Sequence, residues 1–234
     1  MAGEREPCGP VEASADKACR EIRRLIYDYV YKPGDRLYEP TLAAAMSMSR
    51  TPIREALARL VSCGFLERDG NRRGYRVPSL TPEDMHTAFR LRVALELHAA
   101  GIAAKRVTAE NIAELRSMNE EEVRCYIEGD RTRYAELNER LHLRVASLSG
   151  DPYACRYVQE MLSRTTLYSY FFSEFFTQGR MPKNVNDRGL PGYAEHKTVI
   201  DALETRDPKR VRESLKRHLM TTFSHYAGRE LEVF

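Results

Sequence analysis

The feature that most constrains this chain is the order of helix and turn signals that opens its first third. Apolar residues recur at helical spacing between Ile22 and Tyr29, and the pattern stops at the turn-forming segment Lys32–Asp35. A second, short helix is expected around Pro40, because a proline in the first turn costs no helical hydrogen bond. The tight segment Ser47–Ser49 then leads into a third helix, so three helices lie close together in the sequence.

The third helix is expected to begin after Ser49, whose hydroxyl is suited to capping it, and to end at Gly64. Its apolar residues fall at i, i+3, i+4, i+7 and i+8 between Ile53 and Val61. Residues 65–68 and 75–77 have the composition of two strands joined by a glycine-bearing turn. The pattern predicts a winged helix-turn-helix domain over residues 14–78, with a two-stranded wing.

Beyond a proline-rich linker at residues 79–82, every periodic segment is helical. We expect a mainly α protein in which residues 83–228 form an all-α bundle of six or seven helices. Residues 1–13 are expected to be a disordered leader, and residues 177–192 to be either a lid or disordered. The expected helices of the bundle cover residues 82–106, 109–128, 131–149, 152–176, 193–205 and 208–228.

The absence of a long apolar stretch, the N-terminal residues and the cysteine spacing together predict a soluble protein of the cytoplasm. The longest uncharged stretch, Pro40–Ser49, is about half of what a membrane-spanning helix needs, so no membrane partner is expected. The charged residues and prolines at the N-terminus are unlike a signal peptide. Five scattered cysteines, with no Cys-x-x-Cys pair, suggest neither a disulfide framework nor a zinc ribbon.

The excess positive charge lies entirely in the first third of the chain. Residues 1–78 contain 14 Lys and Arg against 11 Asp and Glu, whereas residues 79–234 contain 23 of each. Seven arginines lie between Arg50 and Arg76. By itself this is either a solvated charged face or the footprint of a polyanion such as DNA.

The position of the arginines favours DNA, because the second helix of a helix-turn-helix enters the major groove with its first two turns. Arg50 and Arg54 are four residues apart and share a face, so one can hold a guanine while the other reaches a base or a phosphate. Thr51 can contact a phosphate or a thymine methyl. The wing adds the basic residues Arg72 and Arg73 and the small residue Gly74.

The segments KPGDRL, SRTPIREAL, GFL and RGYRV resemble the winged helix-turn-helix of the GntR family of bacterial transcription regulators. The resemblance implies double-stranded DNA as the partner, and a homodimer that reads a palindromic operator through two half-sites. One difference from many members is Pro40, where they have a further DNA-binding arginine. The expected DNA-binding residues are Arg36, Ser49, Arg50, Thr51, Arg54, Arg72, Arg73 and Gly74.

Three histidines of the helical region lie on or beside apolar helix faces, namely His142, His196 and His218. Imidazoles inside a bundle need partners, and one first-row metal ion can satisfy several of them. Asn138 precedes His142 by one helical turn and can add an oxygen ligand. Three core histidines hydrogen-bonded to other groups would show the same spacing, so both interpretations remain open at this point.

Residues 82–226 also resemble the FCD ligand-sensing domain of the FadR-type branch of that family, through the motifs RxxxE, NxxxH, EHxxxI and RHL. The resemblance implies a divalent transition metal, zinc or nickel, held by Asn138, His142, His196 and His218. The family pattern has an aspartate where this chain has Asn138, which removes one negative charge from the set.

The same resemblance implies that Arg92 binds a small carboxylate effector beside the metal. Taken alone, Arg92 can simply pair with Glu96 at i+4. The function expected is therefore a ligand-responsive, DNA-binding transcription regulator rather than an enzyme. Two alternatives are a metal-dependent hydrolase with a basic appendage, and a metal-free sensor in which the histidines bind the ligand directly.

Overall fold

The computed structural model describes residues 14–70, 74–172 and 191–227. The chain divides into two compact units, one ending at Pro78 and the other starting at Ser79, with residues 63–65 grouped with the second. The expected leader and the wing residues Arg72 and Arg73 lie outside the described residues. So does the expected lid, except for its last two residues, which begin a helix.

The first unit contains the three expected helices, α1 (Ser14–Tyr27), α2 (Glu39–Ala45) and α3 (Arg50–Ser62). Pro40 lies in the first turn of α2, where its missing N–H costs nothing. The apolar stripes of the helices face one another and exclude water. The core of this unit is formed by Ile22, Ile26, Leu42, Ile53, Leu57 and Leu60, each 2% exposed or less.

A small antiparallel sheet completes the first unit, and it has one strand more than the sequence predicts. The expected wing strands are β2 (Glu67–Arg68) and β3 (Tyr75–Arg76), and β1 (Arg36–Leu37) pairs with the other edge of β3. Leu37 lies opposite Tyr75 in this pairing. Unlike β2 and β3, β1 is not joined to its partner by a short glycine-bearing turn, so no local sequence pattern predicts it.

Six helices make up the second unit in the described residues, so the prediction of a helical bundle is confirmed. Threonines cap two of them, since Thr81 accepts from the Asp84 N–H and Thr108 forms a capping box with Asn111. Gly129 ends α5 with a φ of 77°, a conformation that glycine adopts without strain. The helices are α4 (Pro82–Ala103), α5 (Ala109–Glu128), α6 (Arg131–Leu148), α7 (Pro152–Phe172), α9 (Pro191–Glu204) and α10 (Pro208–Ala227).

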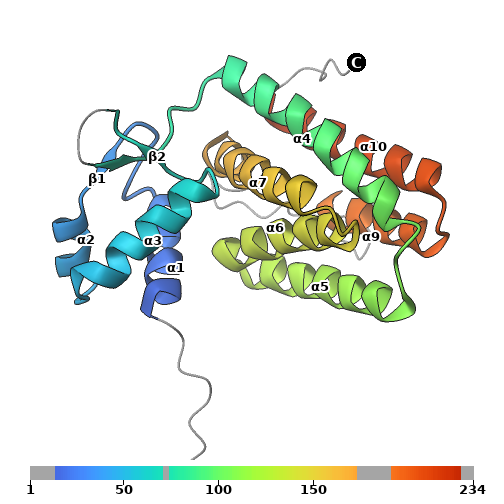
Figure 1. Cartoon of the computed structure of the whole chain (residues 1–234), viewed down its shortest axis with the longest axis horizontal. Helices are drawn as coiled ribbons and strands as arrows, with labels where there is room; N and C mark the ends of the chain where they lie inside the picture. The colour runs from blue at the N-terminus through green and yellow to red at the C-terminus, as the bar shows by residue number, and fades with distance from the viewer. Residues whose placement is uncertain (1–13, 71–73, 173–190, 228–234) are drawn as a thin grey trace, which may run out of the picture. The chain divides into compact units, whose positions relative to one another are not determined.

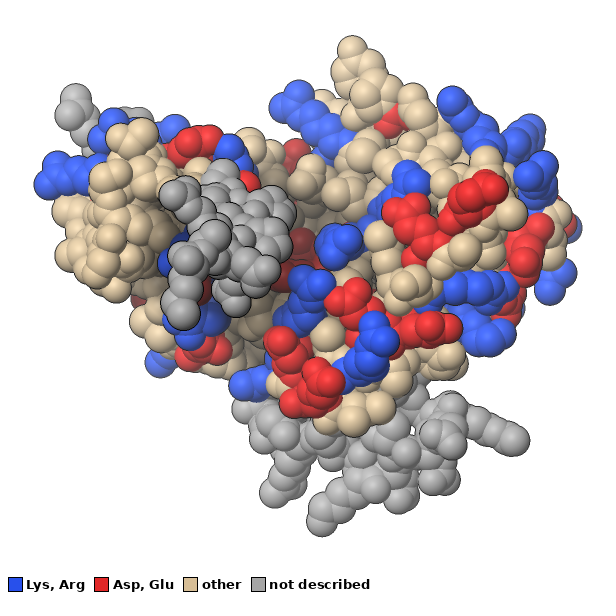
Figure 2. Space-filling view, turned by 90° about the horizontal axis from the view of Figure 1, so that it is seen from below, with Lys and Arg blue, Asp and Glu red and all other residues tan. Residues whose placement is uncertain are grey.

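Within this unit α4 packs against α6, α7 and α10, and α5 packs against α6 and α9 (Figure 1). Buried residues such as Phe89, Leu115, Leu141, Ile200 and Phe223 form one continuous apolar core between these helices. No helix among the described residues is long and apolar enough to cross a membrane. On the face seen in Figure 2, acidic and basic side chains are interspersed over the helical unit, in agreement with its equal numbers of both.

Candidate DNA interface and metal centre

The expected base-reading residues lie on the solvent-exposed face of α3. Ser49, Arg50, Thr51 and Arg54 are all exposed, whereas Ile53 and Leu57 point into the core. Arg50 makes no side-chain hydrogen bond or ion pair within the part of the chain that the structure describes. The first two turns of α3 therefore present polar and cationic groups to solvent, as a recognition helix must.

Two of the expected DNA-binding arginines are engaged by acidic residues of their own unit. The Arg54 guanidinium binds the carboxylate of Glu39, with Nη2 3.0 Å from Oε2. Arg36 Nε lies 2.8 Å from Oδ2 of Asp69, at the start of the wing turn that also contains Gly74. Sequence reasoning missed both acidic partners, because each comes from a segment distant along the chain.

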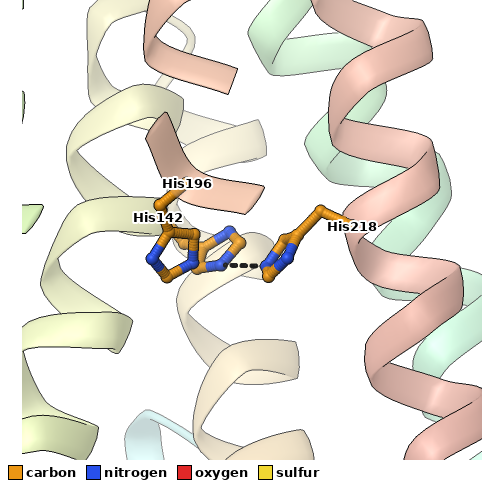
Figure 3. Close-up of side chains that lie close together, drawn as sticks. All are labelled: His142, His196 and His218. Atoms are coloured by element: carbon orange, nitrogen blue, oxygen red, sulfur yellow. Dashed lines mark hydrogen bonds between the residues drawn. The ribbon is translucent and has the colours of Figure 1, made fainter. Parts of the chain in front are cut away.

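The three histidines predicted as metal ligands come together inside the helical unit. His142 belongs to α6, His196 to α9 and His218 to α10, and their rings converge in Figure 3. All three are buried, at 2%, 1% and 5% exposure. One ligand nitrogen from each lies within 4.8 Å of the others, and the Nε2 atoms of His142 and His218 are 3.1 Å apart. A ligand pair on tetrahedral zinc is separated by about 3.3 Å, given Zn–N distances of about 2.0–2.1 Å.

Each histidine is also hydrogen-bonded through Nδ1 to a glutamate, which the sequence did not predict as part of the site. His142 pairs with Glu96 at 2.6 Å, His196 with Glu122 at 2.8 Å and His218 with Glu195 at 2.7 Å. A carboxylate behind an imidazole fixes the ring and leaves Nε2 on the opposite side as the ligand atom. Glu122 in particular lies on a helix, α5, that contributes no histidine, so no spacing in the sequence reveals it.

The electrostatics of the cluster favour neutral imidazoles at His142 and His218. Burial lowers the pKa of His142 and lowers that of His218 well below its usual range, and the neighbouring imidazoles and Arg92 act in the same direction. Burial would raise the pKa of Glu96, but the charge of Arg92 and the hydrogen bonds from His142 and Arg92 outweigh it and keep that pKa below its usual range. An ionised Glu96 accepts from Nδ1, so Nε2 of a neutral His142 carries a lone pair.

This arrangement fits a divalent transition metal. The Nε2 atom of His196 is buried and has no hydrogen-bond partner among the described residues. An unpaired buried nitrogen is costly, and a cation that accepts three Nε2 lone pairs removes this cost at once. Three imidazoles suit zinc or nickel. The fourth expected ligand, Asn138, lies one turn before His142 on α6 and is partly buried.

Arg92 is buried in α4 and takes part in an internal hydrogen-bond network. Its Nε donates to Glu96 at 2.5 Å, and its Nη1 donates to the hydroxyl of Thr165 at 3.0 Å. The i+4 pairing with Glu96 that the spacing allowed is thus present. These two bonds use two of the five N–H donors of the guanidinium.

Comparison with known proteins agrees with this two-unit architecture. Residues 14–77 match the family of bacterial regulatory proteins, gntR family, and residues 87–221 match the FCD domain family. The chain is 25% identical to the uncharacterised HTH-type transcriptional regulator YdhC of Bacillus subtilis, over 88% of this chain and 85% of the relative. It is 27% identical to the HTH-type transcriptional regulator McbR of Escherichia coli, over 79% of each.

The solved structure of E. coli McbR/YncC has the same fold, with a TM-score of 0.70 and 23% identity over 90% of this chain and 95% of that one. A putative GntR regulator from Rhodococcus sp. RHA1 gives a TM-score of 0.65 at 22% identity, covering 92% of this chain and 97% of that one. The FCD match alone spans more than half of the chain. The chain belongs to the gntR family, with a C-terminal FCD domain, and is a DNA-binding transcription regulator.

Proposed function

We propose that this regulator responds to a small carboxylate that binds at a metal held by the histidine cluster, and that it reads a palindromic operator as a homodimer. The observation that carries the proposal is the convergence of three buried imidazoles, each bound at Nδ1 by a glutamate. Three converging imidazoles, each with a carboxylate bound to its Nδ1 atom, are the arrangement expected around a metal ion.

Zinc or nickel would be held by His142, His196 and His218, with the Asn138 amide oxygen as the fourth protein ligand. When bound, such an ion supplies a Lewis-acidic position to which a carboxylate oxygen can coordinate. The residues around it set the charge of the site. Because Asn138 is neutral, the negative charge comes from the glutamates behind the histidines rather than from a direct ligand.

The hydrolase alternative needs a general base on the Nε2 side of the histidines. The three glutamates at the cluster all lie on the Nδ1 side, where they bind the rings. This placement favours a sensing site over a reaction site. The metal-free sensor remains a distinct outcome, and elemental analysis of protein purified without an affinity tag separates it from the metal-bound form.

Arg92 is proposed to bind the effector through the N–H donors that Glu96 and Thr165 leave free. We expect a panel of small mono- and dicarboxylates to contain an acid that changes operator affinity by about 5- to 150-fold, the usual range of coupling between two sites. Fluorescence anisotropy with and without each acid measures this change. An acid that raises the thermal midpoint but leaves operator affinity unchanged would show that the pocket is filled without regulating DNA binding.

The DNA-binding role is tested most directly at Arg50, because this arginine has no partner to lose among the described residues. We expect Arg50→Ala to weaken binding to a selected duplex by about 1–3 kcal/mol and to relax base preference at one position. Binding to a random duplex should change much less. The control is Arg24→Ala, which removes an arginine of α1 that pairs with Glu21 and Asp28. Equal losses on selected and random duplexes would assign Arg50 to a phosphate instead.

A further inference from the structure

We infer that Glu39 is a specificity-determining residue of the DNA interface, acting as a positioning residue for Arg54. The inference rests on the proposed role of Arg54 in reading a base. Glu39 is the first residue of α2, and Arg54 lies in the second turn of α3. Fifteen residues separate them, so the pair exists only because the helix-turn-helix places the start of α2 beside the exposed face of α3.

The carboxylate of Glu39 binds one edge of the Arg54 guanidinium. Nε donates to Oε1 at 3.2 Å and to Oε2 at 3.1 Å, and Nη2 donates to Oε2 at 3.0 Å. The two partners differ in exposure, since the Glu39 side chain is 22% exposed and the Arg54 side chain 64%. A mostly covered carboxylate therefore holds an exposed arginine in one orientation.

This contact leaves the other edge of the guanidinium for DNA. An arginine has five N–H donors, and Glu39 uses the one on Nε and one on Nη2. Of the three donors that remain, one on Nη1 and one on Nη2 form the fork that matches O6 and N7 of guanine. Glu39 can thus orient Arg54 without competing for the atoms that would read the base.

The same contact discourages binding to phosphate. Glu39 cancels the charge of Arg54, so the pair as a whole gains little from an anionic backbone. Arg50, four residues earlier on the same face, has no such counter-charge in the described part of the chain. The contribution of Arg54 to DNA binding therefore depends on base hydrogen bonds rather than on net charge.

The surroundings show that the pair is accessible. It lines a hollow of about 700 Å³, which is also lined by Tyr38, Arg68 and Gly74. This hollow therefore lies between the start of α2, the recognition helix α3 and the wing strands. A DNA group that contacts Arg54 from within this hollow also lies close to Glu39.

The test is a binding selection with full-length protein and a library of random-sequence duplexes, followed by sequencing of the bound fraction. We expect Arg54→Ala to lose preference at one base pair of each half-site by about 5- to 150-fold. Glu39→Ala should reduce preference at the same base pair by about 2- to 13-fold, which corresponds to the ordering of one long side chain. Glu39→Ala and Glu39→Gln should both tighten binding to a random duplex. Both should also make the plot of log affinity against log salt concentration steeper, by up to about one unit of slope.

Glu21→Gln is the matched control, because it removes the same charge from an ion pair of α1 in the same unit. The double variant Glu39→Ala, Arg54→Ala should resemble Arg54→Ala at the affected base pair. If both Glu39 variants keep the wild-type preference and match Glu21→Gln on random DNA, the inference is wrong even though Arg54 reads a base. If Arg54→Ala keeps full preference, the proposed role of Arg54 fails first. Thermal midpoints identify a variant that has lost its fold, and Glu39→Gln then carries the test.

Discussion

His196→Ala is expected to lower the zinc affinity of this regulator by more than 100-fold. The substitution removes a proposed ligand, whereas loss of an outer-shell partner of a ligand typically costs 10- to 100-fold. The Nε2 atom of His196 is the clearest candidate, because it is buried and has no other partner among the described residues. Zinc titration against a chelating indicator, together with the metal content of the purified protein, measures the effect.

Two companion variants show whether the loss is specific. His98→Ala removes a histidine of α4 whose side chain is 59% exposed, and it should leave zinc affinity unchanged. Glu122→Gln keeps an acceptor for Nδ1 of His196 but removes the charge, so its effect should fall within the outer-shell range. Unchanged metal binding in His196→Ala would favour the metal-free sensor, in which the three imidazoles are hydrogen-bonding groups.

Much of the fold follows from local signals in the sequence. The helices appear where apolar residues recur at helical spacing and where Pro40, Thr81, Thr108 or Gly129 marks an end. These signals lie within a few residues of the structure they specify, so a single sequence contains them. The strand β1 has no such signal, because its two residues pair only when the wing folds back beside them.

The residues of the candidate sites also fall into those that the sequence predicts and those that only the structure reveals. The resemblance named the three histidines, and the structure brings them together, but Glu96, Glu122 and Glu195 become partners only through packing of α4 on α6, α5 on α9 and α9 on α10. Glu39 likewise meets Arg54 across fifteen residues. Residue type and spacing thus predict candidate ligands on helix faces. They do not identify the acidic groups that orient those ligands, because glutamates are common on any helix.

Glu96 connects the two halves of the proposed sensing site, and its charge depends on Arg92. Both side chains are almost completely buried, at 4% exposure for Arg92 and 3% for Glu96. Glu96 accepts from Arg92 through one oxygen and from His142 through the other. A pKa below its usual range keeps this carboxylate ionised, so it needs a buried cation or strong donors on both oxygens.

Arg92→Ala is therefore expected to lower the free energy of unfolding of the helical unit by about 3–5 kcal/mol, because it leaves a buried carboxylate without its cation. The matched control is Arg144→Ala on α6, whose arginine pairs with Glu114 at 2.7 Å on the surface and should contribute at most about 1 kcal/mol. Urea unfolding at fixed protein concentration measures both. The double variant Arg92→Ala, Glu96→Gln should recover part of the loss, since it removes the unpaired charge. Equal small losses for Arg92→Ala and Arg144→Ala would mean that His142 alone compensates Glu96, and that Arg92 is free to serve the effector without a structural role.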